Sequence, residues 1–356
     1  MKAKFLALAA LLVGMAACQT DPNGLELDRN GEAAVTLNVG LPNGATRAAG
    51  ANSALGAIDN GIDLAIYDIR FILEVYDANG ELAKDRMVKV GDATQAAFNF
   101  RLVPGRNYKF VVWADFVNEG SEADLHYNTS TENGLRDVKI IEEKWTAIDE
   151  SRDAYTAAVD VEDYSGASQI DPIVLTRPFA KLRVVTNDIK EMITLRPEIV
   201  KVNYFDTEFY TAFDAFAENP INQSYTGHEL TVNLKEDFYT NENPDENGVE
   251  KGVKTLFADY FFAKEGDRVM FSMDVVFNDR STLPTVMFNT NIPVDRNKLT
   301  TIYGPVLTDA NNVTVKIESE FDKPAIDEIV WDGTSVKEPA QDADGNYIIY
   351  EGAELA

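Results

Sequence analysis

The chain has 356 residues, with 59 acidic against 32 basic side chains and a formal net charge of −27 at pH 7. Such a charge repels nucleic-acid phosphates and anionic lipid surfaces, so we expect no nucleic-acid partner. The length exceeds what one hydrophobic core usually supports, so we expect two domains.

The first eighteen residues have the pattern of a secretory lipoprotein signal. Lys2 and Lys4 form a positive start, residues 5–15 are apolar but too short to span a bilayer, and small residues lead to Cys18. Cys18 is the only cysteine, so it cannot form an internal disulfide. We expect Cys18 to accept the lipid, and residues 19–31 to form a flexible tether. A plain signal peptide with an incidental cysteine is the alternative.

From residue 32 the sequence has the period-two alternation of a half-buried β-strand. The apolar positions are Val35, Leu37, Val39 and Leu41. The following loop is small and polar with one basic residue, Arg47, so the Arg47–Ala48 bond suits a trypsin-like protease. Cleavage at this bond would remove the first strand together with the lipid anchor.

Many short apolar segments separated by turn residues follow, which indicates an all-β fold rather than α/β units. Residues 119–160 are more polar and could hold a short helix or long loops. The other strands are expected at residues 62–76, 98–102, 108–113, 171–175, 177–185, 199–205, 228–234, 256–262, 268–277 and 298–307.

The tail contains a second alternating segment, whose apolar residues are Val313, Val315, Ile317 and Phe321. If the first strand lies at a sheet edge and is cut away, it leaves a groove. A tail strand of similar alternation from a second molecule could fill that groove, and this head-to-tail contact would propagate into a fibre. Alternatively, the tail segment is the closing strand of the second domain, and Arg47 is an ordinary loop residue.

The sequence shows no arrangement typical of an enzyme. Only two histidines occur, His126 and His228, and we interpret both as surface residues because no nucleophile motif lies near them. With Cys18 assigned to the lipid, a zinc site of the usual Cys/His type cannot be built. We therefore predict no catalytic residues, no metal and no cofactor. A hydrolase with paired carboxylates is the alternative, because acids are abundant.

The order of these motifs resembles that of the FimA-like fimbrillins, the lipoprotein-derived pilins of Bacteroidetes-type bacteria. In both, a signal ending in a cysteine and a first strand precede a processing arginine, here within Thr46-Arg47-Ala48. Three later segments also resemble the family: residues 104–114, 177–182 and 295–302.

The resemblance implies two transthyretin-like β-sandwich domains, residues 32–175 and 176–308, followed by a C-terminal appendage of residues 309–356. It implies lipoprotein export to the outer-membrane surface, cleavage between Arg47 and Ala48, and removal of the first strand. The segment containing Val313 would then be the donor strand, with residues 329–331 and 347–350 as alternatives.

The implied function is that of a structural and adhesive fimbrial subunit. Its partners would be copies of itself, other pilus subunits, the outer-membrane lipid and a host or bacterial surface receptor. A non-polymerising surface lipoprotein that binds glycans or proteins is the alternative.

Overall fold

The computed structural model describes residues 26–42, 62–192, 194–224, 229–234, 253–310, 312–318 and 325–331. Within these residues the chain forms strands β1 to β20 and four short 3-10 turns. The prediction of an all-β fold is therefore confirmed. The turns are η1 (Gly134–Arg136), η2 (Glu142–Lys144), η3 (Glu150–Arg152) and η4 (Ile189–Glu191).

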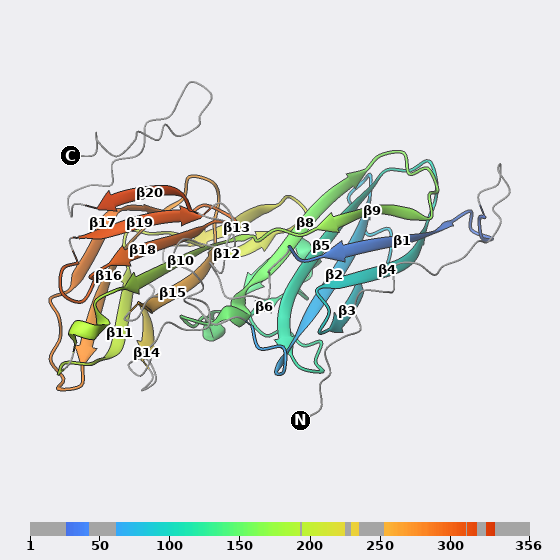
Figure 1. The fold of residues 1–356 in the computed structure, drawn as a ribbon. Coiled ribbons are helices and arrows are strands. Elements are labelled where there is room, and N and C mark those ends of the chain that lie inside the picture. The colour runs from blue at the N-terminus through green and yellow to red at the C-terminus, as the bar shows by residue number, and fades with distance from the viewer. Residues whose placement is uncertain are drawn as a thin grey trace, which may run out of the picture.

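The first domain is a sandwich of two sheets, with strand orders β4-β1-β9 and β3-β2-β5-β8 (Figure 1). Apolar side chains on the facing sides of these sheets form one buried core, and their removal from water stabilises the sandwich. Its strands are β1 (Ala33–Gly40), β2 (Tyr67–Asp77), β3 (Met87–Gly91), β4 (Gln95–Leu102), β5 (Tyr108–Asn118), β8 (Ala154–Val161) and β9 (Gln169–Val174).

The second domain packs a four-stranded sheet, β14-β11-β16-β17, against a sheet of order β20-β19-β18-β10-β15-β12-β7-β6, in which β13 also pairs with β12. In β16 every second residue is buried, the pattern of a strand with one face on a core. The strands are β6 (Tyr127–Asn128), β7 (Val138–Ile140), β10 (Phe179–Thr186), β11 (Pro197–Tyr204), β12 (Phe209–Asp214), β13 (Asn219–Ser224), β14 (Glu229–Asn233), β15 (Lys254–Phe262), β16 (Arg268–Phe277), β17 (Val286–Pro293), β18 (Leu299–Gly304), β19 (Val313–Glu318) and β20 (Ala325–Trp331).

Two short strands from the first half of the chain belong to the sheet of the second domain. β6 pairs with β7, and β7 pairs with β12, where Lys139 lies opposite Ala212 and Val138 opposite Phe213. These strands have two and three residues, which is too short for alternation to reveal them in the polar segment 119–160. The sheet of the second domain therefore includes two strands from the first half of the chain.

An aromatic core joins the two domains. Trp113 of β5 is fully buried and makes an edge contact with Tyr127, with ring centroids 5.5 Å apart. Phe179 and Phe262, from neighbouring strands of the second domain, stack at 4.7 Å in the same cluster. Offset and edge contacts of this kind add to the stabilisation from buried area.

Buried ion pairs surround this core, each joining the segment around η3 to the second domain or its entry. Arg152 lies 2.7 Å from Asp259, and Lys181 lies 2.6 Å from Glu150. Arg177, just before β10, lies 2.8 Å from Asp153. A buried charge without a partner is costly, so loss of one member of such a pair would destabilise the junction between the two domains.

The tail strand β19 belongs to the second domain. It pairs antiparallel with β18 and is itself followed by β20 at the sheet edge. Val313, Val315 and Ile317 are buried, and the first two are part of the core of this domain. This arrangement differs from the expected appendage beginning at residue 309, because β19 completes the sheet instead of leaving it. Phe321 lies outside the described residues.

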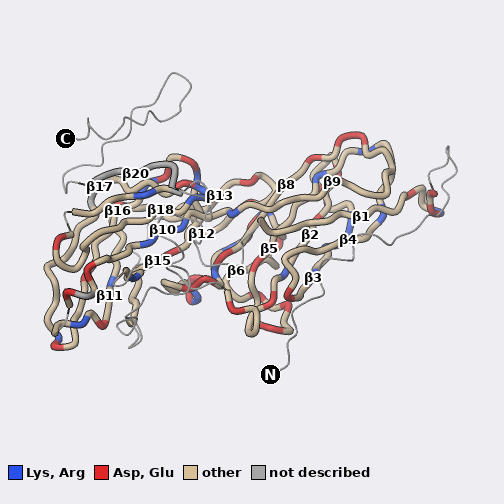
Figure 2. Tube along the Cα trace, in the orientation of Figure 1, with Lys and Arg blue, Asp and Glu red and all other residues tan. Residues whose placement is uncertain are grey.

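Acidic residues occur on both domains, many of them in the loops between strands (Figure 2). Within the described part of the chain, no helix is long and apolar enough to cross a membrane.

Candidate functional site: the first strand and the sheet it completes

β1 lies in the middle of its sheet. It pairs antiparallel with β4 along its whole length, from Ala33 opposite Leu102 to Gly40 opposite Gln95. On its other side it pairs parallel with β9 from Thr36 to Gly40. The condition that the first strand lies at a sheet edge is therefore not met, because β1 has a hydrogen-bonded neighbour on each side. Its removal would leave a slot between two strands.

The side chains expected to point inward from the first strand do so, and the last of them, Leu41, directly follows β1. These residues are 0–7% exposed and are part of the first domain's core: Val35, Leu37, Val39 and Leu41. Burial of one such aliphatic side chain contributes about 1.5–3 kcal/mol, so the four together contribute roughly 6–12 kcal/mol. That is comparable with the whole stability of a typical domain, about 5–15 kcal/mol. The first sandwich therefore depends on a strand in this position.

The beginning of β1 is fixed by a tight hairpin. One carboxylate oxygen of Asp28 accepts the backbone N–H groups of Asn30 at 2.8 Å and Glu32 at 2.9 Å. Arg101 of β4 lies 2.8 Å from the other oxygen. These contacts lower the pKa of Asp28, with the N–H of Glu32 contributing most.

The end of β1 is held on both sides as well. The N–H of Leu41 donates to the carbonyl of Thr94, and the N–H of Leu175 donates to the carbonyl of Gly40, both at 2.9 Å. Pairing therefore continues up to the loop that contains the predicted processing bond. Cys18, Arg47 and Ala48 themselves lie outside the described residues, and their roles stay predictions.

His126 is buried, contrary to its interpretation as a surface residue, because it packs beneath the η3 segment with only 7% of its surface exposed. Its Nε2 lies 2.8 Å from Oγ of Ser151, and that hydroxyl donates to Asp149 Oδ1 at 2.5 Å. The serine proton therefore points to Asp149, and Nε2 of the histidine must donate. A catalytic histidine needs the reverse arrangement, so this trio is structural. His228 lies outside the described residues.

The stability of the protein is expected to fall as the pH drops below about 6.5, because burial lowers the pKa of His126 from its ordinary value of 6.5. The unfolded chain then takes up a proton that the folded chain resists, and the loss continues until the folded state also titrates. Urea unfolding at about pH 7.5 and about pH 5.5 measures this effect. A His126→Gln variant should lose less stability than the wild type between the two pH values. His228 is present in both proteins, so its titration contributes equally to both and does not affect the difference. An equal loss in both proteins would show that His126 is not responsible.

No group of three or more His, Cys, Asp or Glu side chains in the described residues is arranged to hold a metal ion. The absence of a metal, a cofactor and an enzymatic activity stays a prediction.

The chain matches one known protein family. A family model described as "Family of unknown function (DUF6562)" matches residues 27–346. No curated protein matches the chain.

Several solved structures show distant similarity. A candidate cell adhesion protein from Bacteroides eggerthii is 14% identical with a TM-score of 0.49, and the match covers 83% of this chain and 98% of that one. A candidate adhesin from Bacteroides thetaiotaomicron is 13% identical with a TM-score of 0.42, covering 82% and 98%. The fimbrial anchor protein Mfa2 from Porphyromonas gingivalis is 12% identical with a TM-score of 0.37, covering 80% and 98%. Function must therefore be argued from the chain's own residues.

Proposed function

The chain belongs to DUF6562, a family of unknown function, and we propose that it is a structural and adhesive subunit of a cell-surface fimbria that assembles by exchange of β1. One observation carries this proposal. β1 is a central strand of its sheet and supplies four core side chains, yet it is the first of the described strands, and the segment after it, residues 43–61, has a single basic residue, Arg47. One cut in that segment would separate β1 from the rest of the domain.

Maturation would proceed in two steps. Lipid attachment at Cys18 would carry the precursor to the outer-membrane surface, and an arginine-specific protease would then cut between Arg47 and Ala48. Release of β1 would leave the facing edges of β4 and β9 unpaired and the core open. Because unpaired buried backbone groups and exposed apolar surface are both costly, the cleaved subunit would strongly favour a new strand in the slot. A strand that took the place of β1 would run antiparallel to β4 and parallel to β9.

The donor strand would come from the tail of a second copy. The segment with Val313, Val315, Ile317 and Phe321 has a suitable alternation, but its β19 portion is paired on both sides and would have to leave β18 as well. Among the strands that the structure describes, β20 lies at the sheet edge and pairs with β19 alone, so fewer ladder bonds break when it detaches. The structure therefore supports residues 325–331 as the better donor candidate.

An Arg47→Ala variant is expected to keep β1 in place and to form no fibres, because the slot never opens. N-terminal sequencing of the protein from the native cell surface should find Ala48 first in the wild type and not in the variant. Arg29→Ala is the matched control. Arg29 is also a basic residue near β1, but it precedes the strand, so this variant should be processed and should polymerise normally. Fibres of normal length from Arg47→Ala would remove Arg47 from the mechanism.

A second candidate function is that of a monomeric surface lipoprotein that binds glycans or proteins. The full integration of β1 and β19 into their sheets favours it, because neither strand needs a partner molecule in this arrangement. Mature protein that still begins at a lipidated Cys18 would support this function over the fimbrial one.

A further inference from the structure

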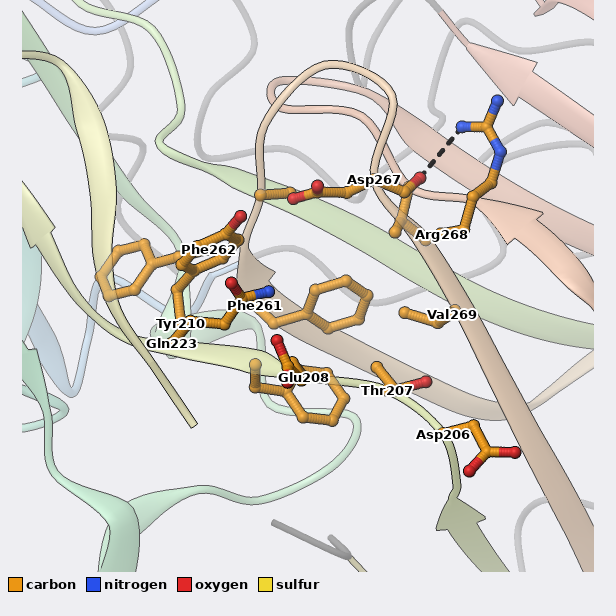
Figure 3. Close-up of a pocket in the computed structure, with 13 residues that line it drawn as sticks. Asp206, Thr207, Glu208, Tyr210, Gln223, Phe261, Phe262, Asp267, Arg268 and Val269 are labelled. Carbon is orange, nitrogen blue, oxygen red and sulfur yellow. Dashed lines mark hydrogen bonds between the residues drawn. The ribbon is translucent and has the colours of Figure 1, made fainter. Parts of the chain in front are cut away.

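The second domain has a hollow of about 440 Å³ beside β12, β15 and β16 (Figure 3). Polar groups at its rim already have partners within the chain. Asp267 Oδ2 accepts the backbone N–H of Lys264 at 2.7 Å, and the backbone carbonyl of Asp267 accepts Nη1 of Arg268 at 3.0 Å. These hydrogen bonds stabilise the loop between β15 and β16. In the first domain, by contrast, one strand has few partners.

β9 is attached to its sheet by β1 alone, among the strands that the structure describes (Figure 1). The two strands pair at four positions, whereas β1 pairs with β4 at eight. The β1–β9 pairing also shifts register between Leu37 and Val39. Pro172 of β9 lies at this shift and has no N–H to donate. Of the two strands beside β1, β9 is therefore the more weakly paired.

β9 also contributes little to the core of the first domain. One of its side chains, Ile173, is buried, and the adjacent Val174 is 64% exposed. β4 in contrast contributes Phe98 and Leu102, which are at most 1% exposed, and short loops join it to β3 and β5. Less apolar surface becomes exposed to water when β9 separates from β1 than when β4 does, so β9 separates at a lower cost in free energy.

The chain is anchored on both sides of β9 by contacts that do not involve β1. Before β9, the N–H of Tyr164 donates to the carbonyl of Arg106 at 2.9 Å, in the turn that precedes β5. After β9, Thr176 exchanges backbone hydrogen bonds of 2.8 and 3.0 Å with Thr156 of β8. Residues 165–174, which we call the strap, lie between these two anchors.

The start of the strap has the composition of a hinge. Residues 165–168 are Ser-Gly-Ala-Ser, all of them small, and Gly166 has a φ of +84°, a value that glycine adopts without steric cost. Hinges are short segments that absorb a change of backbone angles. At the other end, Leu175 is fully buried and belongs with the second anchor. The strap can therefore lift away from β1 while both anchors hold.

We propose that the strap opens and closes as a unit while the rest of the first domain stays folded. Its consequence for assembly rests on the proposed function. A central strand cannot leave its sheet sideways while both neighbours pair with it. With the strap open, β1 is paired with β4 alone, so a cleaved β1 can leave on that side and a replacement strand can enter there. The strap would then close by pairing with the new strand.

Amide hydrogen exchange of the uncleaved full chain, followed by NMR, tests this proposal. The N–H of Thr36 donates to the carbonyl of Ser168 in the strap, whereas the N–H of Leu41 donates to the carbonyl of Thr94 just before β4, both at 2.9 Å. After correction for intrinsic rates, the Thr36 amide should exchange about tenfold faster than the Leu41 amide, because local opening costs less free energy than unfolding of the domain. Fraying cannot produce this difference, since Leu41 follows the end of β1 and Thr36 lies within the strand.

Ile173→Ala removes the one buried side chain of β9. It should therefore speed exchange at Thr36 by a further factor of about ten, with exchange at Leu41 unchanged. Val174→Ala, at the adjacent exposed position, is the matched control and should change neither rate.

Two outcomes would overturn the proposal. Equal exchange at Thr36 and Leu41 in the wild-type chain would show that β9 opens only when the whole domain unfolds. Equal acceleration of both amides in Ile173→Ala would show the same. These measurements need neither cleavage nor fibre assembly, so failure of the strap proposal is distinguished from failure of the proposed fimbrial function.

Discussion

A Val315→Asp variant is expected to lose the folded second domain. Val315 is fully buried in the core between the two sheets and sits on a strand paired on both sides. The substitution removes an apolar side chain and places an unpaired charge there, which together cost several kcal/mol. A typical domain has only about 5–15 kcal/mol of stability. Thermal unfolding followed by circular dichroism should show a markedly lower melting temperature.

Thr314→Asp provides the control for this experiment. Thr314 is adjacent on the same strand, but its side chain is only partly buried, so the same new charge stays hydrated. Ile317→Asp should destabilise in the same direction as Val315→Asp, since Ile317 is also buried. If Val315→Asp melts like the wild type while fibres disappear, β19 is not needed by its own domain and is the donor strand of a neighbour.

A Leu37→Asp variant of the uncleaved chain is expected to destabilise the first domain by several kcal/mol. Leu37 is the central inward residue of β1 and is fully buried. A carboxylate there faces the opposite sheet without a partner, and β1 can no longer complete the sandwich. Hydrogen exchange should show lost protection in β1, β4 and β9, and thermal unfolding should occur earlier.

Asn38→Asp is the matched control for β1, because Asn38 points to solvent from the same strand. Its melting temperature should lie close to the wild-type value. If Leu37→Asp retains wild-type protection in β4 and β9, the first domain is stable without β1. In that case a replacement strand would not raise the stability of the first domain, and strand exchange would have no driving force.

The alternation of apolar and polar residues predicts some features of a strand and not others. In β1 it predicts the strand and the buried face, because successive side chains of a strand point to opposite sides. It does not reveal which strands lie alongside, since pairing depends on backbone groups that every residue has. For this reason the groove hypothesis had to assume an edge position for the first strand, whereas β1 lies between β4 and β9. For the same reason the sequence could not decide whether β19 is a donor strand for a second molecule or a strand of its own second domain.

Features that combine residues from distant segments could not be predicted from the sequence either. The buried ion pair of Arg152 with Asp259 joins residues 107 positions apart in the chain, and neither is part of a recognisable motif. His126 is buried by the η3 segment, which follows it by more than twenty residues and shows no periodic signal. The periodicity of a segment indicates its own secondary structure. These contacts, in contrast, form only when distant segments pack together in the folded chain.

The pairing of β7 with β12 also has a consequence for biosynthesis. β6 and β7 leave the ribosome well before β12, the strand to which β7 pairs. Until then, Trp113 and Tyr127 face water, because Phe213 and Phe262 of the second domain are not yet present to cover them. Domains usually fold in order of synthesis, and transiently exposed apolar surface promotes aggregation. The nascent first half is thus a natural client for a holding chaperone, and expression of residues 32–175 alone should yield an insoluble fragment.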